Sequence, residues 1–493
     1  MKEKDLEQLS QDNEKKNLHS HEEGAGTKAK GLYSHAEGIR TKASKDGSHA
    51  EGILAKAKGA AGHAEGFSTI AMGEASHAEG GHTKANGEAS HSEGQLTFSV
   101  GVASHAEGSQ TAANREASHA EGYKTIANGY GSHAEGGHTT ANGEAAHSEG
   151  YETFAQGFAS HAEGLETRTN GDISHAEGYK TIAEGISSHA EGSSSIADGR
   201  YAHAEGIQTK AKGYASHAEG DRTMAYGNSS HAQGVLTTAS GYASHAEGFK
   251  VVASGMNSHG EGKGTNTNEF EGAHIIGKYG DADASYSWYL ANGISNDTRG
   301  IAAKIIGKTA DMFVDGIIGT SSTNYAEMFE MVDGNRIDIG YFVTLEGKKI
   351  RKANNEDQYI LGVTCASQGI LGASGELRWK NKYQVDEWGR VLYHDVVISS
   401  IKDDDEREII AERIESQPIL NPEWNSMEKY ISRLKRTEWI AVGLLGQMLI
   451  RDDGTCKVNG YCKANKQGIA TMSKNGYRVL ERTGANQILI LFR

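Results

Sequence analysis

The chain has 493 residues and a formal net charge of −15 at pH 7 without a basic cluster, which argues against a nucleic-acid-binding protein. Its longest apolar runs, such as 439–445, are too short to cross a bilayer, and the polar N-terminus lacks the apolar stretch of a secretory signal. Three unclustered cysteines form neither a disulfide framework nor a zinc signature, so we expect a protein made in the cytoplasm, with no membrane segment and no cofactor.

Residues 20–262 consist of a 14-residue repeat. The tetrad His-x-Glu-Gly starts at His21 and returns every 14 residues until His259, which gives 18 copies. A unit reads Ser-His-Ala-Glu-Gly-x-x-Thr-x-Ala-x-Gly-x-x, as in residues 76–89. A fixed period of this kind predicts one structural unit stacked on copies of itself.

The composition of a unit favours two short strands over a helix. Two glycines in 14 residues would cost a helix about 2 kcal/mol, and the apolar spacing does not fit 3.6 residues per turn. In a strand, Ser76, Ala78 and Gly80 share one face, and Thr83 and Ala85 share a face of the next strand. These small residues predict a slim β-roll, on the order of 85 Å long at about 4.8 Å per rung.

The outward face of the first strand hardly varies between the units. It carries His in all 18 units and Glu in all but one, where Gln233 stands. Since solvated positions vary freely, we expect this His/Glu face to meet another copy of the chain around a three-fold axis. Two chemical interpretations stay open, a column of metal ions and a His–Glu hydrogen-bond ladder that fixes the register of the chains. We favour the ladder and expect no metal, because an ion at every rung would pack cations too densely.

The period and the small inward residues resemble the head repeats of trimeric adhesins, which are left-handed parallel β-rolls in homotrimers. The resemblance covers residues 20–262 and implies that fold and a homotrimer. Such repeats occur in bacterial surface adhesins, which carry an export signal and a membrane anchor, and in phage and prophage tail proteins. This sequence shows neither a signal nor an anchor.

Residues 263–323 interrupt the period with aromatic residues and short β-like runs. Two of these runs, 301–306 and 312–318, suggest a hairpin with its turn at Asp315-Gly316. We expect this segment to be a β-rich cap and neck, because an open last rung invites edge pairing. Trp288 and Tyr289 are candidates for lining a pocket that binds a host surface glycan.

Residues 324–493 predict an α+β domain. Two helices are expected at 403–415 and 421–434, the second with Pro422 at its first position. The three cysteines are interpreted as small buried hydrophobic residues. Strand-like stretches cover residues 339–345, 359–364, 391–398, 439–443, 448–451, 478–480 and 487–492.

This C-terminal part carries motifs in a specific order. Residues 321–330 read Ser-Ser-Thr-Asn-Tyr-Ala-Glu-Met-Phe-Glu, and Gly-Tyr-Phe-Val at 340–343 and Asp-Glu-Trp-Gly at 386–389 follow. They resemble the intramolecular-chaperone autoprocessing domain of phage neck-appendage and tail-spike proteins, called peptidase G2. The resemblance implies a module that trimerises, templates the folding of the preceding β-structure and cuts itself off, before the acidic residue of an Asp-Tyr-Ala-Glu motif.

The resemblance implies that the scissile bond here is Thr323–Asn324. The Thr323 hydroxyl would attack its own carbonyl, and water would hydrolyse the resulting ester, while Ser322 is a rival nucleophile. Glu327 would act as the general base or would protonate the leaving amine. Asn324 replaces the Asp of the family, so a carboxylate that polarises the bond is missing.

The sequence therefore predicts a homotrimeric phage or prophage tail-spike or appendage protein, located in the virion tail and extracellular after release. Residues 1–19 would attach it to other tail or virion proteins, and the C-terminal domain would be a single-turnover autoprotease. The alternatives are a bacterial surface trimeric adhesin and a glycan-degrading spike, which would place paired acidic residues in a groove between adjacent rods.

Overall fold

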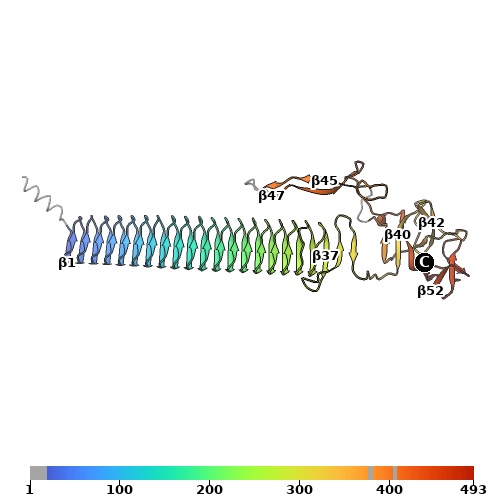
Figure 1. The fold of residues 1–493 in the computed structure, drawn as a ribbon, viewed down its shortest axis with the longest axis horizontal. Helices are drawn as coiled ribbons and strands as arrows, with labels where there is room; N and C mark the ends of the chain where they lie inside the picture. The colour runs from blue at the N-terminus through green and yellow to red at the C-terminus, as the bar shows by residue number, and fades with distance from the viewer. Residues whose placement is uncertain (1–18, 376–380, 403–407) are drawn as a thin grey trace, which may run out of the picture. The chain divides into compact units, whose positions relative to one another are not determined.

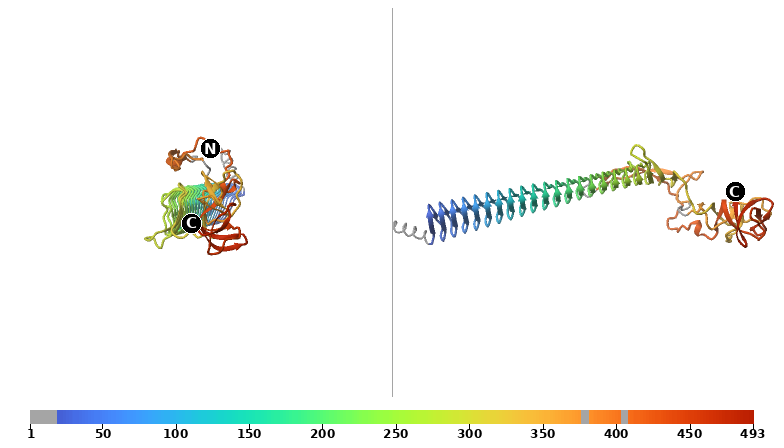
Figure 2. Two further views of the ribbon diagram at one scale, coloured as in Figure 1. Left: turned by 90° about the vertical axis from the view of Figure 1, so that its right-hand side faces the viewer. Right: turned by 90° about the horizontal axis from the view of Figure 1, so that it is seen from below.

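The computed structural model describes residues 19–375, 381–402 and 408–493, so the predicted attachment segment lies outside the described residues except for His19. The chain divides into two units, Met1–Gly316 and Ile317–Arg493. The first unit is a long stack of β-rungs, which Figure 1 shows from blue to yellow, and the second is a β-rich domain (Figure 2).

Each rung of the first unit contains two strands. A five-residue strand starts at every repeat histidine, from β1 (His21–Ala25) to β35 (His259–Lys263), and a two-residue strand follows it, from β2 (Lys28–Ala29) to β34 (Val252–Ala253). Successive rungs pair in parallel, each histidine opposite the next, as His35 opposite His49. The prediction of a parallel β-roll with 14 residues per rung is confirmed.

The interior of the roll is filled by small side chains. In the rung that contains β9 (His77–Gly81) and β10 (Lys84–Ala85), Ser76, Ala78, Thr83 and Ala85 are all at most 1% exposed. Ser76 Oγ donates a hydrogen bond of 2.7 Å to a backbone carbonyl, which satisfies the buried hydroxyl. Gly80 differs from the prediction, because it is exposed within β9 rather than buried in the interior.

The stack continues beyond the last repeat. Strands β36 (His274–Lys278) and β37 (Trp288–Asn292) add two more parallel rungs. Strand β38 (Ile301–Ile305) then pairs antiparallel with β37, and β39 (Met312–Val314) with β38, so an antiparallel hairpin closes this end. The predicted turn at Asp315-Gly316 is wrong, because the chain reverses between β38 and β39.

The second unit is built on one mainly antiparallel sheet. Its long central strand β49 (Trp439–Arg451) pairs with β40 (Asn324–Glu330) along one half and with β53 (Gln487–Phe492) along the other. The neighbouring strands are β41 (Phe342–Glu346), β42 (Lys349–Lys352), β43 (Gly362–Thr364), β44 (Ile370–Gly372), β50 (Tyr461–Ala464), β51 (Ala470–Ser473) and β52 (Tyr477–Gly484).

The core of this domain lies on both halves of β49. Phe342, Val363, Met448, Ile450 and Ile488 pack in one buried cluster. Met331, Val343, Ile350 and Val442 form a second one. All seven predicted strand regions contain strands, and 439–443 and 448–451 are parts of the single strand β49.

The two predicted helices are wrong. Residues 413–418 form β48 (Arg413–Pro418), which pairs with β45 (Tyr393–Ile398), and β46 (Ile401–Lys402) pairs with β47 (Glu408–Ile410). Apart from residues 403–407, which lie outside the described part, this segment is a β-ribbon, because strand pairing overrides the local helical periodicity.

The second predicted helix, at 421–434, is replaced by turns. The 3-10 helix η1 (Arg433–Lys435) is the only helix in the described part of the chain. None of the helical segments within those residues is long and apolar enough to cross a membrane.

Candidate functional site

The repeat histidines form one continuous column of stacked rings. From His35 to His259 the centroids of successive rings lie 4.6–4.9 Å apart, and the ring planes differ by 1–11°. The in-register parallel pairing causes this stacking, because it repeats each side-chain position at every rung. His274 and Trp288 extend the column, at centroid distances of 4.5 and 4.3 Å.

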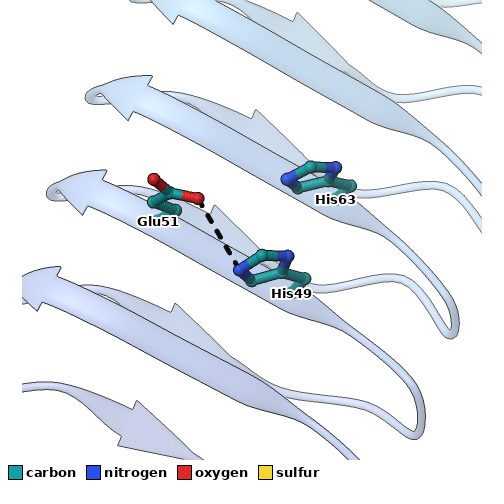
Figure 3. Close-up of side chains that lie close together, drawn as sticks. All are labelled: His49, Glu51 and His63. Carbon is teal, nitrogen blue, oxygen red and sulfur yellow. Dashed lines mark ion pairs between the residues drawn. The ribbon is translucent and has the colours of Figure 1, made fainter. Parts of the chain in front are cut away.

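A column of glutamates runs beside the histidines. In the rungs from His35 to His161, and in those of His203 and His245, the His Nε2 and a Glu Oε atom lie 3.5–3.9 Å apart, as in His49 and Glu51 (Figure 3). This separation is too long for an ordinary hydrogen bond. Many of these Nε2 atoms are buried and have no hydrogen-bond partner. A His–Glu hydrogen-bond ladder is therefore not formed within the described part of this single chain.

The position of the histidines changes their titration. The side chains are only about 31–38% exposed. Burial lowers the pKa of His63, and the neighbouring imidazole of His77 lowers it further, while Glu65 and other nearby glutamates raise it. The same causes lower the pKa of His105 and of His245. Folding therefore favours the neutral imidazole at these three positions.

The proposed scissile bond lies where the chain enters the sheet of the second unit. Thr323 is exposed, and Asn324, the first residue of β40, is 8% exposed. The Thr323 hydroxyl donates a hydrogen bond of 3.3 Å to the carbonyl oxygen of Gln447. The Gln447 N–H donates one of 3.4 Å to the Thr323 carbonyl oxygen. The main chain of Gln447 thus contacts both the hydroxyl and the carbonyl of Thr323.

Gly446 allows this approach. Its φ is +111°, a conformation that L side chains rarely adopt, and a Cβ there would lie closer than 3.0 Å to the Thr323 carbonyl oxygen. Gly446 also faces Asn324 in the pairing of β40 with β49. On the other side, the Gly369 N–H donates a hydrogen bond of 2.9 Å to the Asn324 carbonyl. The backbone on both sides of the Thr323–Asn324 bond is therefore held.

The structure does not bring Glu327 to Thr323. The two residues lie four positions apart along an extended strand, a separation of about 13 Å. Between them Tyr325 donates a hydrogen bond of 2.6 Å from Oη to Glu327 Oε1, which raises the pKa of Tyr325. Ser322 is half-buried, and its carbonyl oxygen accepts a hydrogen bond from Thr320. Within this chain, the Thr323 hydroxyl is bound by a backbone carbonyl and not by Glu327.

Two nucleophiles can attack the Thr323 carbonyl carbon, the Thr323 hydroxyl and water. If the Thr323 hydroxyl attacks its own carbonyl carbon, the ring that closes contains Oγ1, Cβ, Cα and C, a strained four-membered lactone. Water meets no such restriction when it attacks the same carbon. In either route negative charge develops on the Thr323 carbonyl oxygen, where the Gln447 N–H stabilises it. Gly446 and Gln447 could not be found from the sequence, because they are more than 120 residues away from Thr323 and act through their backbone.

The predicted glycan pocket is not formed by Trp288 and Tyr289. Adjacent strand residues point to opposite faces, so Trp288 stacks on His274 outside the roll. Tyr289 is 3% exposed and donates a hydrogen bond of 2.9 Å to Asp283.

Two of the three cysteines are buried as expected. Cys456 and Cys462 lie in the core of the second unit, and burial raises the pKa of the Cys456 thiol to about 12. Cys365 is half-buried, and its pKa is raised by the same cause. These thiols are therefore protonated near neutral pH and poorly suited to nucleophilic attack.

Comparison with known proteins shows a family match for the C-terminal part of the chain. Residues 287–487 match the family model described as "Peptidase_G2, IMC autoproteolytic cleavage domain". The C-terminal part of the chain is a Peptidase_G2 domain. The predicted resemblance to this family is thereby confirmed.

The similar proteins come from Bacillus and its phages. The pre-neck appendage protein of Bacillus phage B103 is 39% identical over 154 residues, which are 31% of this chain and 16% of that protein. The phage-related protein YobO of Bacillus subtilis (strain 168) is 34% identical over 173 residues, 34% of this chain and 20% of YobO. The chain is thus a homologue of pre-neck appendage proteins that matches a fifth or less of these relatives' length.

A solved structure matches as well. The C-terminal fragment of bacteriophage phi29 gene product 12 is 32% identical to this chain, with a TM-score of 0.28. The match covers 34% of this chain and 100% of that fragment.

Proposed function

We propose that this protein is a structural component of a phage or prophage tail appendage, a homotrimeric rod whose Peptidase_G2 domain guides assembly and then cleaves itself off at Thr323–Asn324. The homology to pre-neck appendage proteins supports a place in the virion. The parallel roll with small interior residues supports a rod, left-handed like the adhesin heads that it resembles.

The observation that supports this proposal is the position of the Thr323–Asn324 bond. Thr323–Asn324 joins an exposed segment to the first strand of the Peptidase_G2 sheet, so cleavage there would release a domain whose core is complete without the preceding residues. The contacts from Gln447 and Gly369 hold the bond only when β40 is paired. Self-cleavage at this bond would therefore follow the folding of the domain.

A trimer would increase the area that each residue of the rod buries. The interior of the roll consists of Ala, Ser and Thr side chains, which bury little apolar area for each residue that is ordered. Burial of the His/Glu face against other copies would supply additional contact area. This supports the proposal that the face lies between the chains of a homotrimer.

Self-cleavage is tested by expression of the full chain without a protease partner. Denaturing gels and intact mass should show a C-terminal fragment that starts at Asn324. Thr323→Ala should remove this fragment if the Thr323 hydroxyl is the nucleophile and keep it if water attacks the carbonyl carbon, and Thr323→Ser should keep it in either case. A single uncleaved band from the folded wild-type chain would contradict self-cleavage, and light scattering of the same sample decides between a trimer and other oligomers.

A further inference from the structure

We propose that the His/Glu face binds divalent transition-metal ions of the zinc type, each held by the imidazole Nε2 and the carboxylate of one rung. This inference goes beyond the proposed function and depends neither on self-cleavage nor on a particular oligomer. It rests on the donor geometry, on the unpartnered imidazoles and on the charge of the glutamate column.

The two donors of one rung are already at the right separation. In the rungs from His35 to His161, and in those of His203 and His245, Nε2 and Oε lie 3.5–3.9 Å apart, as in His119 and Glu121 at 3.5 Å. An ion with bonds of about 2.0–2.2 Å to nitrogen and oxygen in a tetrahedral arrangement needs its ligand atoms about 3.4 Å apart. An ion can therefore enter between the two side chains with little movement of either.

Most of the imidazole Nε2 atoms of the column have no hydrogen-bond partner. The Nε2 atoms of His49, His63, His77, His91 and His105 are buried and make no hydrogen bond, and most later repeat histidines share this state. A buried nitrogen without a partner is unfavourable. Figure 3 shows that His49, Glu51 and His63 lie on one face, and these three offer ligand atoms within 4.8 Å of one another.

The glutamate column attracts cations. The carboxylates recur at every repeat rung except that of Gln233, about 4.8 Å apart, so like charges repel along the column. In the single chain, a groove of about 610 Å³ follows part of the column. Its lining includes Glu205, Glu219, Gln233, Glu247 and Glu261. Because each site pairs nitrogen with oxygen, it favours zinc, cobalt, nickel or copper over the all-oxygen preference of calcium and magnesium.

The same geometry limits the number of ions. Successive rings are parallel, so their nitrogen lone pairs point the same way and one ion cannot lie in the planes of two adjacent rings. Ions on adjacent rungs would also be only about 4.8 Å apart and would repel each other. We therefore expect at most about one ion for every two rungs. Each ion would complete its coordination with water or with the same residues of a second copy.

The test uses the full-length chain without a histidine tag. After removal of metal with a chelator, the chain is dialysed against micromolar Zn²⁺ with excess Ca²⁺, and bound zinc is counted by elemental analysis. The column variant carries Glu107→Gln, Glu121→Gln and Glu135→Gln. The control variant carries Glu88→Gln, Glu116→Gln and Glu144→Gln, which removes equal charge at exposed turn positions in this part of the rod.

We expect the wild type to bind more than one Zn²⁺ per chain, the control to bind the same number, and the column variant to bind at least one fewer. Co²⁺ should give the visible absorption of a low-coordinate nitrogen–oxygen site. Equal zinc counts in the column variant and the control, or displacement of zinc by Ca²⁺, would overturn the inference. If the column variant does not fold, the single change His119→Gln and the Ca²⁺ competition on the wild type decide the question.

Discussion

Gly80 and Gly94 are stacked so closely that a Cβ on Gly80 would lie less than 3.0 Å from the carbonyl oxygen of Gly94. Gly80 also has a φ of +99°. The same relationship links the equivalent glycines of the neighbouring rungs. The glycine of His-x-Glu-Gly is therefore needed for the close approach of successive five-residue strands, and not for space inside the roll.

This relationship predicts a strong difference between two adjacent substitutions. Gly80→Ala should destabilise the roll by about 3 kcal/mol or more, because it combines an unfavourable φ with overlap against the next rung. Gly81→Ala in the same rung should change stability by less than about 0.5 kcal/mol, since nothing lies within 4 Å of a Cβ there. Urea unfolding measures both, and equal midpoints for the two variants would refute this role of Gly80.

A second prediction concerns the hydroxyls inside the roll. Ser92 Oγ and Thr97 Oγ1 form a buried hydrogen bond of 2.8 Å, whereas the rung of Ala78 leaves Thr83 Oγ1 buried without a partner. Ala78→Ser should supply this partner and stabilise the roll by about 1 kcal/mol.

The matched control for this prediction is Ala176→Ser. In its rung Thr181 Oγ1 already donates a hydrogen bond of 3.0 Å to the Glu177 carbonyl. The new hydroxyl should therefore give no gain there. Each variant adds one hydroxyl group to the wild-type chain, at equivalent positions of two rungs. A stabilisation of equal size in both would show that the unpartnered Thr83 hydroxyl is not the cause of the stabilisation.

Much of the rod could be predicted because its sequence repeats. Eighteen comparable units separate the inward Ser and Ala positions from the variable turns, and the strand period follows from them. The turns themselves could not be predicted in detail, since residues such as Ala75 and His82 adopt positive φ values of 51° and 58° without being glycine. Stacking between the rungs imposes this conformation against the local preference.

At the end of the rod and in the C-terminal domain, several predictions from the sequence are wrong or incomplete. His274 comes 15 residues after His259, and an Ile occupies the Glu position of its rung. The two further rungs that follow the repeats therefore could not be recognised from the 14-residue period. The segment 408–415 has a helical spacing of apolar residues but forms strands of a ribbon. The proposed site was found from the motif around Thr323, whereas Gly446 and Gln447 required the pairing of β40 with β49.

A third prediction follows from the lowered pKa values of the column histidines. In the folded chain His105 and His119 have a pKa below the ordinary value of 6.5, so the unfolded chain binds more protons as the pH falls through this range. The stabilising contribution of the neutral imidazoles is complete above pH of about 6.5 and is lost as the pH falls through the folded-state pKa. The roll should therefore become less stable between about pH 7 and pH 5 in metal-free buffer.

The pH effect can be assigned by substitution. The double variant His105→Gln, His119→Gln should show a weaker loss of stability on acidification. The control variant His82→Gln, His138→Gln removes two histidines outside the column and should keep the slope of the wild type. Thermal unfolding at several pH values measures this, and a wild-type roll that gains stability on acidification would contradict the assignment. Glu163, whose pKa is raised by its hydrogen bond with Glu149, acts in the opposite direction.

The last prediction concerns the backbone that holds the proposed scissile bond. Gly446→Ala should slow cleavage by about 100-fold, because its Cβ would displace the Thr323 carbonyl from the Gln447 N–H, the donor that stabilises the developing charge. Gly454→Ala is the control, since Gly454 also has a positive φ, of +85°, but nothing lies within 4 Å of a Cβ there. The fraction cleaved over time is followed by intact mass, with circular dichroism to confirm folding. A folded Gly446→Ala chain that is cleaved as fast as Gly454→Ala would show that this contact does not promote the reaction.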